Sequence, residues 1–156
     1  MNARALTVLV SIVAVTAGFS AKSLADVPGP VQASEIKWSA APPTLPAGAE
    51  LAVMAGDPAK PGPVTLRLKM PKGYQIPAHW HPTDERVTVI SGELGLGMGD
   101  QLDKKASAVL KPGGYAVAAA HMNHYAWTKT GAVVQIDLMG PFGITYVNPA
   151  DDPSKK

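Results

Sequence analysis

The chain has 156 residues, with 14 Lys and Arg against 12 Asp and Glu, four His and no Cys. The absence of cysteine excludes disulfides, thiolate nucleophiles and thiolate metal ligands. The nearly balanced, scattered charge excludes the basic surface that nucleic-acid binding requires.

The first 25 residues have the features of a signal peptide. Arg4 gives a positive start, residues 5–19 are mostly small and apolar, and Ser23-Leu24-Ala25 is a small-x-small cleavage pattern. A spanning helix needs about 20 apolar residues, so an uncleaved anchor is the weaker alternative. We expect export by the general route and cleavage after Ala25. The mature chain is then periplasmic or secreted, has no stable membrane anchor, and carries 12 basic against 12 acidic residues.

The mature chain of about 130 residues is long enough for one domain. We expect an extended leader with an N-terminal strand at 26–48, a β-barrel at 49–148 and a polar tail at 149–156. Short runs of β-forming residues between Gly/Pro turns, without helical periodicity, predict an all-β sandwich or barrel. The expected strands are 36–40, 49–54, 64–70, 76–81, 86–91, 93–98, 106–110, 115–119, 124–129, 132–138 and 144–147.

All four histidines fall between residues 79 and 124. His79 and His81 are two apart, so on an extended strand they point to the same face. The Pro82-Thr83-Asp84 turn lets Glu85 open the next strand and point back to the same place. Imidazole and carboxylate donors in this spacing predict a divalent-metal site in a β scaffold.

The spacing around this pair resembles the first motif of the cupin superfamily. It contains Gly73, five residues, His79-x-His81, three residues, Glu85, six residues and Gly92. Every fixed position of the motif is present in the correct register. The resemblance therefore extends well beyond one histidine pair.

The second cupin motif is recognisable but degenerate. Gly113 and His124 stand where the motif requires them. Ala119, His121 and Thr128 replace the usual Pro, Gly and Asn. The loss of these turn residues leaves the metal-ligating position intact.

The resemblance covers about residues 51–147 and is closest to small, exported, single-domain bacterial cupins. It implies a conical β-barrel of the jelly-roll type, a double-stranded β-helix, that binds one divalent metal ion inside. The implied ligands are His79, His81, Glu85 and His124. Such a set suits Zn²⁺, Mn²⁺, Fe²⁺, Ni²⁺ or Cu²⁺. Loading outside the cytoplasm, where Fe²⁺ is oxidised, slightly favours Zn²⁺ or Mn²⁺.

Residues near the motifs are candidates for a substrate pocket. We expect Val87 and Val89 to line the cavity, with Gln75 and Gln135 as polar contacts. His121 has two readings. It is a turn residue at the barrel mouth, where His tolerates a positive φ, or it is an extra ligand or proton carrier and so a catalytic candidate.

The leading hypothesis is a small periplasmic metalloenzyme acting on a small organic molecule, with oxygenase, isomerase and lyase chemistry all open. The alternative is a non-catalytic cupin that binds or senses a small ligand or a metal. We expect a homodimer, because Trp38, Trp80 and Trp127 should face outward and offer apolar area for contact.

Overall fold

The chain folds into two antiparallel β-sheets around one core. The structure, a computed structural model, describes residues 29–156, so the predicted signal peptide and its cleavage site lie outside the described residues. Strands make up 45% and helices 7% of the described chain, which confirms the all-β prediction. Within this part of the chain, no helix is long and apolar enough to cross a membrane.

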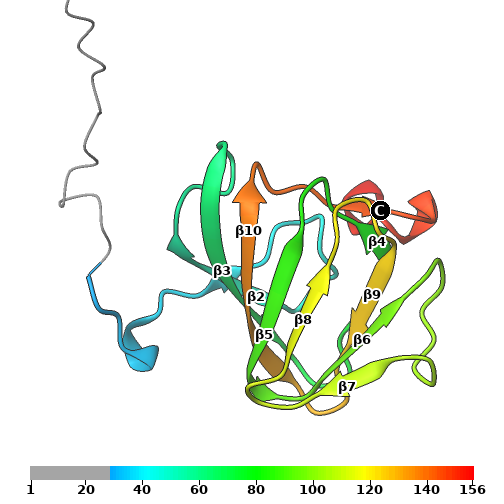
Figure 1. Ribbon diagram of the computed structural model, residues 1–156, viewed down its shortest axis with the longest axis horizontal. Coiled ribbons are helices and arrows are strands. Elements are labelled where there is room, and N and C mark those ends of the chain that lie inside the picture. The colour runs from blue at the N-terminus through cyan, green and yellow to red at the C-terminus, as the bar shows by residue number, and fades with distance from the viewer. Residues whose placement is uncertain (1–28) are drawn as a thin grey trace, which may run out of the picture.

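The strands pair in the crossed order of a jelly roll. The six-stranded sheet contains, in order of pairing, β1 (Ser39–Ala40), β2 (Glu50–Ala55), β3 (Gly62–Met70), β10 (Ala132–Gly140), β5 (Glu85–Gly92) and β8 (Tyr115–Ala118). The five-stranded sheet contains β11 (Thr145–Tyr146), β4 (Gln75–Trp80), β9 (His124–Trp127), β6 (Leu94–Met98) and β7 (Ala108–Leu110). From β3 onward the chain passes repeatedly from one sheet to the other, as Figure 1 shows. This is the predicted double-stranded β-helix.

All eleven expected strands are present, with differences at their ends. The first strand is shorter than expected, Ser39–Ala40 in place of 36–40, and a 3-10 helix at Ala33–Glu35 lies before it. The polar tail contains two further 3-10 helices, Pro149–Asp151 and Pro153–Lys155. Each begins with Pro after an Asn or Asp whose side chain accepts a backbone N–H, a favourable helix start.

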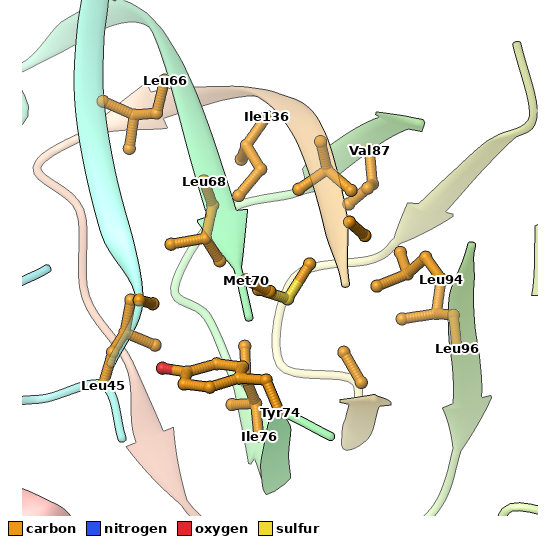
Figure 2. Close-up of a cluster of buried hydrophobic side chains, with 14 of the residues drawn as sticks. Leu45, Leu66, Leu68, Met70, Tyr74, Ile76, Val87, Leu94, Leu96 and Ile136 are labelled. Atoms are coloured by element: carbon orange, nitrogen blue, oxygen red, sulfur yellow. The ribbon is translucent and has the colours of Figure 1, made fainter. Parts of the chain in front are cut away.

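The inward faces of both sheets are apolar because side chains alternate along each strand. On β10, Val134 and Ile136 point inward, and β3 contributes Leu66 and Leu68. Figure 2 shows the side chains of both sheets meeting in one cluster, to which β6 adds Leu96. This shared core fixes the position of the strands that carry the histidines.

The second half of the expected leader closes one side of this core. Leu45 is buried within the cluster (Figure 2). The hydroxyl of Tyr74 donates to the carbonyl oxygen of Pro46 (2.5 Å), and that of Tyr146 donates to the carbonyl oxygen of Thr44 (2.8 Å). This part of the leader is therefore packed into the barrel. The described residues before it, which include the 3-10 helix at Ala33–Glu35, extend away from the sheets (Figure 1).

Replacing Leu45 with alanine is expected to lower the free energy of unfolding by about 2–5 kcal/mol, because it leaves a cavity in the core. The matched control is Val31→Ala, since Val31 is 48% exposed and its truncation should change stability by less than about 0.5 kcal/mol. Urea denaturation of both variants measures the difference. Equal stability of the two variants would show that the leader is not part of the core.

Two glycines on β6 make room for aromatic rings on β9. A Cβ added at Gly95 would lie 2.1 Å from the ring of Trp127, and one at Gly97 would lie 2.3 Å from that of Tyr125. Both rings therefore lie close over the β6 backbone, on the outside of the sheet, as their alternation with His124 predicts. The loop after β6 holds them through hydrogen bonds from Tyr125 Oη to the Asp103 carbonyl (3.0 Å) and from Trp127 Nε1 to Ser107 Oγ (3.0 Å).

Candidate metal centre

The four expected ligands come from the ends of three strands. His79 lies near the end of β4 and His81 directly follows it, while Glu85 is the first residue of β5 and His124 the first of β9. Strands β4 and β9 are paired, with His79 opposite His124. All four side chains are buried, between 1% and 8% exposed. The fold thus brings together inside the barrel residues that are up to 45 positions apart in the chain.

The donor atoms converge on one point. The three histidines each offer a ring nitrogen, and these nitrogens lie within 4.8 Å of one another. Glu85 Oε2 lies 3.3 Å from His124 Nε2 and 3.6 Å from His81 Nε2. Three buried imidazoles therefore form a group that can hold a metal ion, and the Glu85 carboxylate stands beside two of them.

The orientation of each imidazole is fixed by the main chain. In every case Nδ1 lies at hydrogen-bond distance from a carbonyl oxygen, which can only accept, so Nδ1 carries the proton and Nε2 is free to bind a cation. The acceptors are Pro77 for His79 (2.7 Å), Gly143 for His81 (2.6 Å) and Met122 for His124 (2.9 Å).

Two of the inward nitrogens make no hydrogen bond within residues 29–156, although Glu85 stands near both. His81 Nε2 and His124 Nε2 are fully buried and make no hydrogen bond. Buried polar atoms are rarely left unsatisfied, because each costs about 1–3 kcal/mol. A divalent cation between the imidazoles and the carboxylate would satisfy both nitrogens. The residues present therefore fit the divalent metal that the cupin resemblance implies.

The electrostatics of the site favour metal-ready forms of two ligands. Burial, followed by the charges of His124 and His81, lowers the pKa of His79 to about 3, so this imidazole is neutral at physiological pH. Burial alone would raise the pKa of Glu85, but the close contact with His124 and the favourable electrostatic interactions with the surrounding imidazoles outweigh it and lower the pKa to about 2. Glu85 is therefore an anion.

The metal group faces a small apolar cavity. Among residues 29–156, the polar side chains that line it are those of His79, Glu85 and His124. Its volume is about 30 Å³. This is room for about two water molecules, since one water needs roughly 10–15 Å³ of such cavity volume. Many of its apolar lining residues appear in Figure 2. They are Leu68, Met70, Ile76, Val87, Leu94, Leu96, Ala126, Val134 and Ile136.

The two valines expected in this pocket take different places. Val87 lines the cavity. Val89 is buried in the surrounding core, 1% exposed, and does not reach the cavity wall. Several other lining residues were not predicted, among them Met70 on β3, Leu94 and Leu96 on β6, and Val134 and Ile136 on β10. The inward parity of their strands was the signal that could have identified them.

The placement of Gln75 and Gln135 as polar contacts of the cavity is corrected by the structure. Gln75 is exposed and precedes the inward Ile76 on β4. Gln135 stands next to the inward Ile136 on β10, and its side chain lies on the outer face of the sheet beside Arg67. Alternation with Ile136 directs the Gln135 amide away from the metal. The irregularity between Ile76 and His79 interrupts the alternation of β4, so Gln75 does not share the inward face of His79.

His121 is an exposed turn residue. Its φ of 60° is the one positive value of a non-glycine residue in the described chain, which explains how His replaces the usual Gly of the motif. Its ring packs on the outward side of Trp80, with centroids 4.9 Å apart. Its backbone N–H donates to the His81 carbonyl oxygen at 2.9 Å. The buried metal group does not include His121.

Comparison with known protein families identifies this barrel. Residues 25–144 match the family described as "Domain of unknown function (DUF4437)". The chain belongs to the DUF4437 family. No curated protein matches this DUF4437 chain in sequence.

Solved structures show that this DUF4437 domain has the cupin fold. The polyketide cyclase RemF from Streptomyces resistomycificus is 14% identical, with a TM-score of 0.64 over 83% of this chain and 92% of that one. A proposed acetylacetone dioxygenase from Methylibium petroleiphilum is 18% identical, with a TM-score of 0.61 over 81% and 85%. An RmlC-like cupin from Shewanella frigidimarina is 15% identical, with a TM-score of 0.55 over 70% and 87%. The predicted cupin fold is thereby confirmed.

Proposed function

We propose that the chain is a divalent-metal-binding cupin and a small metalloenzyme of the oxygenase type. The observation that carries the proposal is a buried group of three imidazoles and one carboxylate that opens on an otherwise apolar cavity. His79, His81, Glu85 and His124 would hold the ion. A bound divalent ion supplies Lewis acidity and, where it is redox-active, oxygen chemistry. The apolar wall excludes bulk water from the reacting centre.

The cavity lining favours oxygenase over isomerase or lyase chemistry. The latter two generally need a positioned side chain that gives or takes a proton. The three titratable groups that line the cavity, His79, Glu85 and His124, are all assigned to the metal. The spare histidine, His121, lies outside against Trp80. The likeness to a proposed acetylacetone dioxygenase agrees with this choice as an analogy of fold.

The same lining bounds the substrate and the metal. No Lys or Arg lines the cavity, so an anionic substrate would find no cationic side chain there, and we propose a small, uncharged, largely apolar molecule. Of the two metals favoured by the sequence, Zn²⁺ has no redox chemistry. Oxygenase activity therefore selects Mn²⁺ or another redox-active ion of the compatible group.

The test is oxygen consumption by the mature chain loaded in turn with Mn²⁺, Fe²⁺, Cu²⁺ and Zn²⁺, with a panel of small diketones, diols, thiols and keto acids. We expect turnover with at least one redox-active metal and none with Zn²⁺. Ala126→Leu is the matched variant, because Ala126 lines the cavity and is not one of the four expected ligands. It should retain the metal and lose turnover. Stoichiometric metal without oxygen consumption under any condition would contradict the proposal.

A second candidate is a non-catalytic cupin that binds or senses a metal or a very small ligand. The volume of about 30 Å³ favours it, because most organic substrates are larger than two water molecules. In that case calorimetry should show metal binding, and every substrate of the oxygen-uptake assay should remain unchanged. The oxygen-uptake experiment therefore separates the two functions.

We also propose that the protein acts in the periplasm as a homodimer. The family match begins at residue 25, where the predicted signal peptide ends, which supports cleavage there. Mass spectrometry of the protein from the cell envelope should give a chain that starts at Asp26.

The proposed dimer has apolar area available on one sheet. Ile90, Tyr115 and Val117 are exposed on the neighbouring strands β5 and β8 and supply apolar area for pairing. Light scattering at tens of micromolar should report a dimer.

A further inference from the structure

A groove on the outside of the five-stranded sheet lies apart from the metal cavity. It has a volume of about 610 Å³, within the range of about 300–1,000 Å³ typical of small-molecule sites. Trp127 and Gln75, which face each other on β9 and β4, lie in its wall. Along β4, Gln75 is four residues from His79, or about 13 Å at the rise of a strand. Trp127 alternates with the inward His124 on β9, and the irregularity between Ile76 and His79 interrupts the alternation along β4, so the groove lies on the opposite face of the sheet.

The groove is lined by three lysines and no acidic side chain. Lys72 comes from the turn before β4, Lys104 from the loop after β6 and Lys129 from the turn after β9. None of the three forms an ion pair with any carboxylate of residues 29–156. The mature chain has equal numbers of basic and acidic residues. Three unpaired cations around one hollow are therefore a local concentration of positive charge.

The walls of the groove are held in place. The Trp127 ring lies over the β6 backbone, and its Nε1 donates to Ser107 Oγ at 3.0 Å. The turns that carry Lys72 and Lys129 are joined by a hydrogen bond from Thr128 N to the Tyr74 carbonyl oxygen at 2.9 Å. The backbone turns and the indole of this site therefore lose little conformational entropy when a ligand binds.

The indole and the lysines are matched to a ligand with two kinds of surface. Lys104 Nζ lies over the Trp127 ring, 5.5 Å from its centre, so the indole and this cation together form one wall of the groove. Gln75 is exposed at the same groove and supplies an amide that both donates and accepts. Lysine ammonium groups bind carboxylate and phosphate as point charges. A ring-shaped ligand that carries hydroxyls and an anionic group would meet all three.

We propose that this groove is a second binding site, for a small anionic molecule built on a sugar-like ring. The anionic group contacts the ammonium groups of Lys72, Lys104 and Lys129. The ring packs against Trp127, and its hydroxyls bond to Gln75. The site is independent of the metal, because its residues lie on the outer face of the barrel.

The test is an NMR titration of the mature, metal-loaded chain, following the indole N–H signals of Trp38, Trp80 and Trp127. The probes are glucuronate, glucose 6-phosphate, glucose and inorganic phosphate, which separate carboxylate from phosphate and both from the bare ring and the bare anion. We expect at least one of the two anionic sugars to shift the Trp127 signal with saturation in the millimolar range or below. Glucose and inorganic phosphate should bind at least about tenfold more weakly, and Trp38 and Trp80 should not respond.

The matched variants are Lys72→Gln with Lys129→Gln, and Lys60→Gln as the control. The double variant should weaken binding of the anionic sugar by at least about tenfold, with an unchanged thermal midpoint. Lys60 lies outside the groove and pairs with Asp57, so its variant should bind like the wild type. No response of Trp127 to either anionic sugar, binding of glucose or inorganic phosphate as strong as theirs, or equal binding by the double variant would each overturn the proposal.

Discussion

Replacing His81 with alanine is expected to reduce bound metal from one ion per chain to almost none. His81 Nε2 is a buried nitrogen that makes no hydrogen bond and faces the centre of the site. Its loss would remove a direct bond to the metal. Changes in groups that only support a ligand typically cost about 10–100-fold in metal affinity, so this loss should exceed about 100-fold. Elemental analysis of protein purified from its native compartment, with a competition titration, measures the change.

The control is His121→Ala. His121 lies on Trp80 outside the metal group, so its removal should leave metal content unchanged. Equal metal in the wild type and His81→Ala, or loss in His121→Ala alone, would contradict the ligand assignment. The same experiment decides between the two readings of His121, because an extra ligand would lower occupancy when removed.

Metal removal is expected to lower the free energy of unfolding by several kcal/mol. An ion that binds only the folded chain stabilises it by about 2.7 kcal/mol at 100 times its Kd and about 4.1 kcal/mol at 1,000 times. Here the ligands come from β4, β5, β9 and the residue after β4, so the ion would join strands of both sheets. Urea denaturation with saturating Mn²⁺ or Zn²⁺, and again with a chelator, measures the difference.

His81→Ala provides the comparison for this effect. Without that ligand, the added ion should shift the denaturation midpoint of the variant little. The wild type with chelator should likewise lack the shift that the ion causes. An identical midpoint for the wild type with and without the ion would show that the buried imidazoles do not bind it. A shift of equal size in the variant would place the ion elsewhere.

The ligand positions could be predicted because they depend on local geometry. Two-residue alternation places His79 and His81 on one face, and the Pro82-Thr83-Asp84 turn brings Glu85 to the start of β5. The positive φ of His121 was likewise predictable from the residue types that tolerate it. These features depend on a few neighbouring residues. For that reason they can be predicted from the sequence.

The cavity could not be predicted to the same extent, because its size depends on how both sheets pack. Gln135 was expected there although its neighbour Ile136 faces inward and directs it outward. The outward direction of Gln75 depends on the irregularity between Ile76 and His79, which two-residue alternation does not predict. The role of Thr128 also needed the fold. This residue, which replaces the usual Asn of the motif, is buried, and its Oγ1 accepts the Gly131 backbone N–H at 3.1 Å.

Backbone carbonyl groups fix the direction of the three imidazoles, so this direction depends on the course of the main chain. A point mutation replaces a side chain but cannot delete a carbonyl oxygen, so the acceptors at Pro77, Met122 and Gly143 persist through ordinary sequence drift. Surrounding turns can then diverge, as Ala119 and Thr128 illustrate, while the imidazoles keep their direction. Insertions or deletions between these carbonyls and the strands, rather than substitutions, are the evolutionary changes that would misalign the centre.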